Sequence, residues 1–173
     1  LGPVAIGIVY VKKKHFDLCR PTLLGAWNVV SPNFQAQDEV RFVPTAQRYE
    51  PGVLNAAGVY GMKASLELLM GAGIDRVASR LLELKRILLG VLEPLGFDLL
   101  GVRDGMHASG ITTVFHPRVA ASVLQKNLEA EGVVVSLRYD RDGREYLRFS
   151  PHFYNTQEEI ERVAALLKVA LAH

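Results

Sequence analysis

The stretch LRFSPHFYNTQEEIERV, residues 147–163, carries the clearest succession of strand, turn and helix signals in the chain. Arg148 stands between two apolar residues, so its side chain points to the face of the predicted strand opposite theirs. After a turn, Thr156 precedes Glu159 by three residues, which is the spacing of a capping box at a helix start. The stretch therefore predicts a strand that ends in an arginine and leads, through a tight turn, into a helix.

The residues before this stretch predict the rest of a small α+β layer. Short runs rich in β-branched and aromatic residues predict four strands, at residues 97–102, 110–115, 133–137 and 146–149. Asp142-Gly143 is a hairpin signal between the last two strands, and apolar spacing over 120–128 predicts a helix that Gly132 ends. A mostly antiparallel sheet with helices on one face accounts for this order.

The first half of the chain has a different pattern. Residues 4–11 are β-branched and apolar on both faces, which predicts a strand inside a larger sheet. Residues 20–57 contain Pro21, Pro32, Pro44 and Pro51 and no sustained period, so we expect an irregular segment. Helices are predicted over 55–70 and from Asp75, as N-cap, to about Leu92. We expect three parts: 1–57 as sheet end and linker, 58–95 as connecting helices, and 96–173 as the α+β domain.

The composition narrows the class of protein. The chain has 173 residues, of which 49% are hydrophobic and 22% charged, and a net charge of +2, so neither a nucleic acid nor a membrane surface is expected as partner. The longest apolar stretch is interrupted by Glu93, Pro94 and Asp98, which argues against a membrane span. Cys19 is the single cysteine, which excludes an internal disulfide and fits a reducing, cytoplasmic location. No spacing of histidines predicts a metal site.

Arg148 is the first candidate for a binding role. A guanidinium at the mouth of a turn can hold a carboxylate through two parallel hydrogen bonds, a geometry that lysine does not match. The alternative is a structural ion pair with Glu158 or Glu159. His152, in the turn after the strand, is a second candidate for lining such a site.

Residues 147–163 resemble the C-terminal signature of the class V aminotransferases, a pyridoxal-phosphate family of fold type I that includes cysteine desulfurases and isopenicillin N epimerase-like proteins. Other stretches resemble the family in the same order. They are LGPVAIGIVYV, RYEPGVLNAAGVYGMKASLELL, SGITTVF and GVVVSLR. The resemblance implies an α/β parent fold, of which this chain is the C-terminal portion and mainly the α+β small domain.

The resemblance also implies roles for particular residues. Arg148 would grip the α-carboxylate of an amino-acid substrate, with His152 nearby. Gly52, Val53 and Asn55 would approach the phosphate of pyridoxal 5'-phosphate in the partner subunit of a homodimer. Val53 stands where the family has a threonine, and valine has no hydrogen-bond donor.

The chain departs from the family pattern in two further ways. The lysine that binds the cofactor would lie just upstream of Leu1, so we expect no catalytic residue, and no activity, in this chain alone. Cysteine desulfurases carry a nucleophilic cysteine before the signature arginine, whereas VSLRYDRDGREY contains none. In that segment Arg138 is either a second anion contact or an exposed ion-pair partner of Asp140 and Asp142.

The sequence thus indicates part of a pyridoxal-phosphate enzyme that acts at Cα of an amino acid, by transamination, epimerisation or elimination. Two alternatives stay open: a non-catalytic ligand-binding or interaction module, and an inactive truncated fragment. The residues upstream of Leu1 distinguish them, because a lysine there supports the enzyme.

Overall fold

The computed structural model describes residues 2–30, 35 and 38–172, which form two compact units, Leu1–Gly71 and Ala72–His173. Leu1 and Pro32, named above, lie outside the described residues. The boundary between the units falls within the predicted connecting segment 58–95, and the predicted division into three parts stays a prediction.

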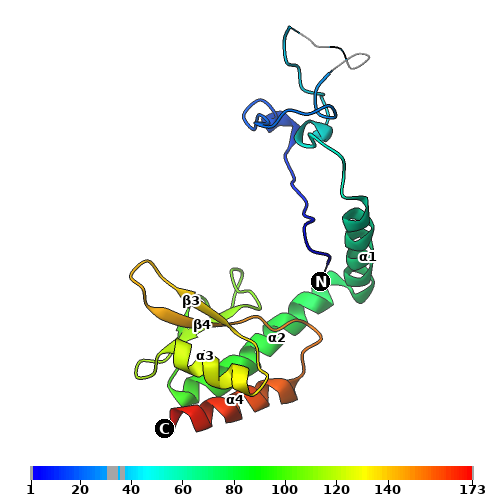
Figure 1. Cartoon of the computed structure of the whole chain (residues 1–173). Helices are drawn as coiled ribbons and strands as arrows, with labels where there is room; N and C mark the ends of the chain where they lie inside the picture. Colours follow the sequence, from blue (N-terminus) through cyan, green and yellow to red (C-terminus); the bar gives the residue numbers. More distant parts are fainter. Residues whose placement is uncertain (1, 31–34, 36–37, 173) are drawn as a thin grey trace. The chain divides into compact units, whose positions relative to one another are not determined.

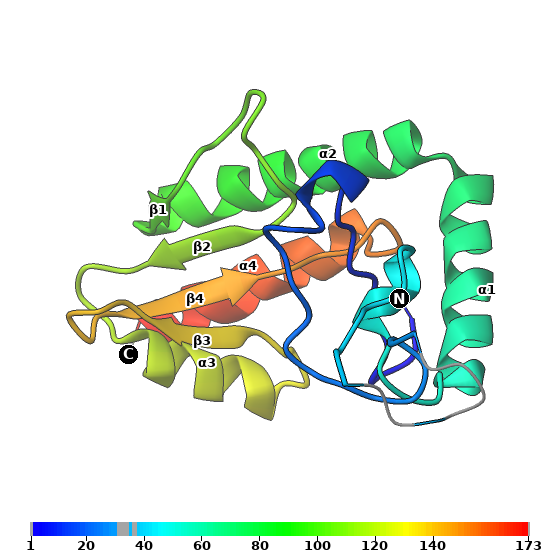
Figure 2. The same cartoon turned by 90° about the horizontal axis from the view of Figure 1, so that it is seen from above.

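The second unit contains three helices and a four-stranded antiparallel sheet with strand order β1-β2-β4-β3. The elements in chain order are α2 (Ile74–Leu92), β1 (Asp98–Leu100), β2 (Thr112–Phe115), α3 (Ala121–Ala130), β3 (Ser136–Tyr139), β4 (Glu145–Phe149) and α4 (Gln157–Leu171). Figures 1 and 2 show the three helices together on one face of the sheet. The predicted α+β layer with helices on one face is confirmed.

A single apolar core lies between the sheet and these helices. Alternation along the strands sends Val114, Leu147 and Phe149 toward the helices, and each of these side chains is at most 5% exposed. The helices contribute Leu84, Leu88, Leu92, Ala121, Leu124, Leu128, Ile160 and Leu167, and Phe97 before β1 completes the cluster. None of the three helices of this unit covers the opposite face of the sheet, which carries Arg148.

The turns of the second unit follow the sequence signals closely. Thr156 accepts a hydrogen bond from the backbone N–H of Glu159, and the Glu159 side chain accepts one in return, so the predicted capping box is confirmed. Gly132 and Gly143 have φ values of 75° and 80°, which only glycine adopts readily, after α3 and in the β3–β4 hairpin. The prediction of Asp75 as N-cap is wrong, because Gly73 occupies that position and Asp75 lies in the first turn of α2.

The first unit has little regular structure apart from one helix. Its elements are the short 3₁₀ turns Lys13–His15 and Ala46–Tyr49, an isolated bridge between Val29 and Phe42, and helix α1 (Ala56–Ala72). The predicted strand over residues 4–11 is wrong in this structure, since these residues are not assigned to any strand. A strand requires a hydrogen-bonded neighbour, and residues 4–11 have no such ladder within the described part of the chain.

A buried amide organises the first unit. The side chain of Asn28, fully buried, accepts a hydrogen bond from the backbone N–H of Gly25 at 3.0 Å and donates to the carbonyls of Leu23 and Arg48 at 2.8 and 3.1 Å. A Cβ at Gly25 would lie 1.8 Å from the carbonyl oxygen of Pro51, so this close approach requires glycine. None of the helices described in either unit is long and apolar enough to span a membrane.

Candidate functional site

Arg148 lies near the end of β4, on the helix-free face of the sheet. It is paired across the sheet with Thr113 of β2 and Ser136 of β3, whose side chains share its face because paired residues point the same way. Arg148 is half-buried, and its Nε is buried without a hydrogen-bond partner in the described part of the chain. A buried guanidinium nitrogen with no partner favours a ligand for this side chain.

The structural alternative for Arg148, an ion pair with Glu158 or Glu159, is not found among the described residues. The carboxylate of Glu159 instead accepts hydrogen bonds from Asn155 Nδ2 at 3.0 Å and from the backbone N–H of Thr156 at 2.9 Å. These bonds hold the pKa of Glu159 below its usual range, with the Asn155 bond the larger cause. Glu159 therefore serves the helix start and does not pair with Arg148.

His152 lies four residues after Arg148, in a turn fixed by Asn155. The side-chain oxygen of Asn155 accepts the backbone N–H of His152 at 2.7 Å, and the imidazole stacks on Tyr154 with ring centroids 4.9 Å apart. Burial lowers the pKa of His152, and its Nδ1 is buried without a partner among the described residues. The neutral ring is thus positioned to exchange a hydrogen bond with a bound group.

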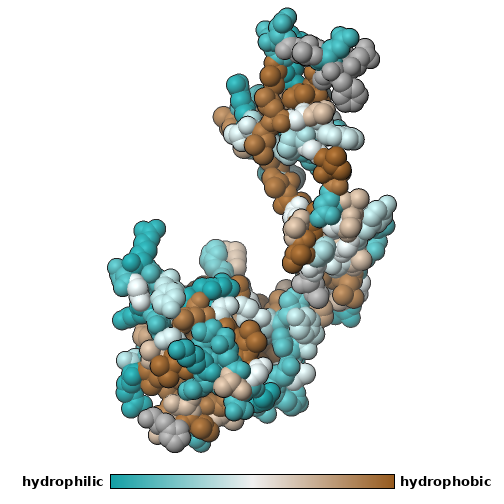
Figure 3. All heavy atoms as spheres, viewed as in Figure 1, coloured by the Kyte–Doolittle hydropathy of each residue, from teal (hydrophilic) through white to brown (hydrophobic). Residues whose placement is uncertain are grey.

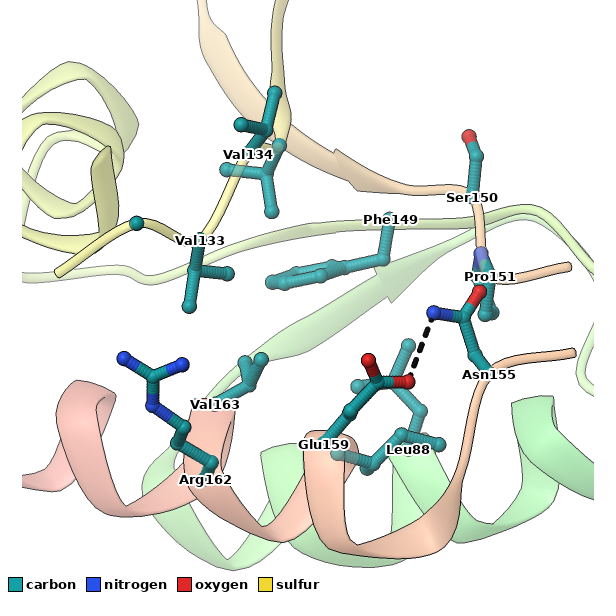
Figure 4. A pocket seen from close by; sticks show the side chains of 13 residues that line it. Leu88, Val133, Val134, Phe149, Ser150, Pro151, Asn155, Glu159, Arg162 and Val163 are labelled. Carbon is teal, nitrogen blue, oxygen red and sulfur yellow. Dashed lines mark hydrogen bonds between the residues drawn. The ribbon is translucent and has the colours of Figure 1, made fainter.

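A hollow next to this turn lies on the other side of β4. It has a volume of about 350 Å³ and is lined by Leu88 of α2, residues 132–135 before β3, the end of β4 and the first turns of α4 (Figure 4). Phe149, Pro151 and Val163 form apolar walls, and the hydrogen bond between Asn155 and Glu159 closes one side. Neither Arg148 nor His152 lines it. The candidate site is therefore the open sheet face, and this hollow is separate from it.

The three residues predicted to approach the cofactor lie before α1 in the first unit. The side-chain oxygen of Asn55 accepts the backbone N–H of Gly58 at 2.9 Å, so this side chain serves the helix start. Val53 is 87% exposed and contributes no donor, and a Cβ at Gly52 would meet nothing within 4 Å. Of the three, Gly52 has no neighbouring atoms where a side chain would be, so a ligand can approach its backbone closely.

Two lysines have partners that take them out of consideration for binding a cofactor. Lys63 faces Glu67 at 3.7 Å on the surface of α1. Lys85 on α2 is buried and donates from Nζ to the carbonyl of Val102 at 2.6 Å, and burial lowers its pKa although Asp104 acts in the opposite direction. Neither of these amines is thus presented for bond formation with a cofactor, and a phosphate contact at Gly52, Val53 and Asn55 stays a prediction. No group of three or more metal-ligating side chains occurs among the described residues.

Sequence reasoning left the role of Arg138 open, and the structure describes its surroundings. Arg138 lies on β3 opposite Tyr146, on the same sheet face as Arg148. The carboxylate of Asp140 is occupied by the backbone N–H groups of Asp142 and Arg144 and by the hydroxyl of Tyr146. No ion pair of Arg138 with an acidic residue is found in the described part of the chain.

The model of the family described as aminotransferase class-V matches residues 1–163. The chain belongs to the class V aminotransferase family. Similar curated proteins include probable cysteine desulfurases of Pyrococcus abyssi, with 26% identity over 97% of this chain and 43% of the relative, and of Xylella fastidiosa, with 30% identity over 97% and 42%. A kynureninase of Bacillus cereus is 27% identical over 96% of this chain and 39% of its own length. The chain therefore spans about two-fifths of the length of these relatives.

Solved structures agree on the fold. A cysteine desulfurase from Thermococcus onnurineus has a TM-score of 0.87 at 21% identity and covers 99% of this chain and 44% of its own. The Escherichia coli cysteine desulfurase CsdA has a TM-score of 0.85 at 23% identity, over 99% and 43%. The C-DES protein, with a TM-score of 0.71 at 17% identity over 93% of this chain and 40% of its own, has been solved with glycine covalently linked to its pyridoxal-phosphate cofactor. The predicted fold type and the predicted cofactor of the family, pyridoxal phosphate, are confirmed.

Proposed function

We propose that this chain is the C-terminal part of a pyridoxal-phosphate enzyme that acts at Cα of an amino acid, and that Arg148 holds the α-carboxylate of the substrate. Membership of the class V family supports the reaction class. The observation that carries the role of Arg148 is that the side chain is half-buried, that its Nε has no hydrogen-bond partner and that it forms no ion pair among the described residues.

Holding the carboxylate has a chemical purpose. Pyridoxal phosphate, when bound, supplies an electron sink for the bond that breaks at Cα. A two-point grip on the carboxylate restricts rotation about the bond between Cα and the carboxyl carbon, and so restricts which bond at Cα is presented for cleavage. Thr113 and Ser136 flank Arg148 on the sheet and place two hydroxyl groups beside it. Transamination, epimerisation and elimination share this requirement.

His152 has a supporting place in the proposal. Its turn follows the end of β4, and the lowered pKa keeps the ring neutral at pH 7, so that the ring can both accept and donate hydrogen bonds. We propose that it lines the site beside Arg148. Gly52, with Val53 and Asn55 beside it, is proposed to approach a cofactor phosphate across a homodimer through backbone N–H groups. The dimer and a cytoplasmic location stay predictions.

The desulfurase activity of several relatives is not part of the proposal. Cys19 lies in the first unit, where it is exposed, and the β3–β4 hairpin contains no cysteine. The segment that supplies a thiol in the desulfurase pattern therefore supplies none here.

The test uses the longest natural chain with its cofactor bound and compares Arg148→Ala with the unchanged protein. We expect the visible absorbance of the cofactor to be unchanged and amino-acid affinity, followed by the change in that absorbance, to fall roughly 100-fold or more, because charge-assisted hydrogen bonds are lost. Arg141→Ala, in the exposed hairpin tip, is the matched control and should bind as before. Equal affinity of the Arg148→Ala protein would reject the proposed grip. Arg148→Lys, which keeps the charge without the two-pronged geometry, checks that a loss is not one of folding.

A further inference from the structure

We propose that Arg138 is a second anion contact in the same site, and that the substrates of this enzyme are amino acids whose side chain carries a carboxylate. This inference rests on the proposed function, since it takes Arg148 as the contact for the α-carboxylate. It adds a substrate class, which neither the family nor the reaction at Cα determines.

The sheet register brings the two arginines together. Arg148 is paired with Ser136, and Arg138 follows two residues later on β3, opposite Tyr146. Residues in this diagonal relation point to the same face and are about 7–8 Å apart, within reach of long side chains. The face they share is the one that α2, α3 and α4 leave uncovered.

The charge of Arg138 has no counter-ion in the described part of the chain. Its Nη1 donates to the carbonyl of Leu137 at 2.8 Å, a neutral local contact. The nearby carboxylate of Asp140 is committed to the hairpin, where three donors, including Tyr146 Oη at 2.9 Å, hold it. These bonds hold the pKa of Asp140 below its usual range, the backbone N–H of Arg144 being the largest cause.

The geometry fits a short dicarboxylic amino acid better than a neutral one. Two cations on one face, separated by a single cross-strand step, match two carboxylates separated by a few carbon atoms. A substrate with an apolar side chain would instead leave Arg138 uncompensated beside it. Thr113 and Ser136, on the same face, add hydroxyl groups that can hydrogen-bond a carboxylate.

The experiment measures binding of aspartate, glutamate and alanine to the cofactor-loaded protein and to its Arg138→Gln variant. We expect the affinity for aspartate or glutamate to fall about 10- to 100-fold and the affinity for alanine to change less than about 2-fold, since one charged hydrogen-bonded contact is removed. Calorimetry with succinate, a dicarboxylate that cannot react at the cofactor, should show the same loss. Arg141→Gln is the control of equal charge change, and Arg138→Lys should recover part of the affinity.

The outcomes separate this inference from the proposed function. If Arg138→Gln changes no affinity, or weakens the binding of alanine and aspartate equally, Arg138 does not contact the substrate side chain and the inference is rejected. The proposed function would still hold if Arg148→Ala weakens the binding of every amino acid. If Arg148→Ala binds every amino acid as before, the proposed function fails first.

Discussion

The two units of the chain are stabilised in different ways. The second unit buries an apolar cluster of twelve side chains between its sheet and its helices. In the first unit the buried residues, among those described, are Phe16, Asn28 and Gly58. Many of its large apolar side chains are at the surface instead (Figure 3), and Val4, Val9 and Leu18 are each more than 80% exposed.

This difference shows where each unit obtains its order. Burial of apolar area is the main stabilising contribution to a folded domain, and the second unit has it within its own residues. The first unit relies on hydrogen bonds from Asn28, on the bond from Tyr49 Oη to the carbonyl of Cys19 at 2.7 Å, and on Arg48 lying 5.0 Å from the centre of the Phe16 ring. Large exposed apolar patches usually mark surfaces that contact other protein segments.

The largest effect that tests this comparison is expected for Leu147→Ala in β4. Leu147 is fully buried in the core, so its truncation should lower the free energy of unfolding by about 2–5 kcal/mol, through lost burial and the cavity left behind. Urea unfolding of the whole chain, followed by far-ultraviolet circular dichroism, measures it.

The matched control is Leu23→Ala in the first unit, where the side chain is 67% exposed. It should change the free energy of unfolding by less than about 0.5 kcal/mol. Similar losses in both variants would contradict the view that only the second unit depends on a packed apolar core.

A smaller effect is expected for Asn28→Ala, and it should be confined to the first unit. The substitution leaves the backbone N–H of Gly25 and the carbonyls of Leu23 and Arg48 without their partner, at a cost of about 1–3 kcal/mol. Amide hydrogen exchange measures the effect residue by residue. Protection should fall around Asn28 and stay unchanged in β4, whereas an equal loss in β4 would show that the two units unfold together.

The same contrast explains how far the sequence could predict the structure. In the second unit most signals are local and agree with the packing, so Thr156, Gly132 and the Asp142-Gly143 hairpin have the predicted roles, whereas Asp75 is not the N-cap of α2. β3 begins at Ser136 rather than 133, because residues 133–135 pair with no neighbouring strand. Local pattern shows that a strand occurs, and the partner strand determines where its ladder begins.

In the first unit the helix predicted over residues 55–70 is confirmed by α1 (Ala56–Ala72), and the rest was predictable only as an irregular segment. Residues 4–11 have the composition of a strand, but a strand also needs a neighbour, and no spacing within the segment supplies one. Asn28 gave no signal because a buried structural amide and an exposed loop amide look alike in sequence.

The candidate site was predicted in part. Alternation placed Arg148 on the face opposite Leu147, and the structure agrees. That Thr113 and Ser136 flank it could not be predicted, because this depends on the register between strands far apart in sequence. The sequence could not show that Asp140 does not pair with Arg138, because this depends on the hydrogen bonds that Arg144 and Tyr146 donate to Asp140.

The smallest expected effect is on the pH dependence of stability, and it tests whether the charge of Glu145 stabilises the start of α3 in the second unit. The carboxylate of Glu145 accepts the backbone N–H of Ser122 at 2.8 Å, at the start of α3, where Ala120 at the N-cap makes no side-chain bond. Bonds from Ser122, the side chain first and the backbone second, lower the pKa of Glu145. A carboxylate whose pKa is lowered in the folded state stabilises the protein at pH values above its ordinary pKa, about 4.3. This contribution is lost as the pH falls through the folded-state pKa.

Glu145→Gln should therefore be less stable than the unchanged protein near neutral pH, and the difference in stability should narrow as the pH falls below about 4. Urea midpoints across this range measure it, and Glu161→Gln on the exposed side of α4 removes the same charge without a backbone partner. A gap that stays constant with pH would show that the α3 start does not depend on the charge of Glu145.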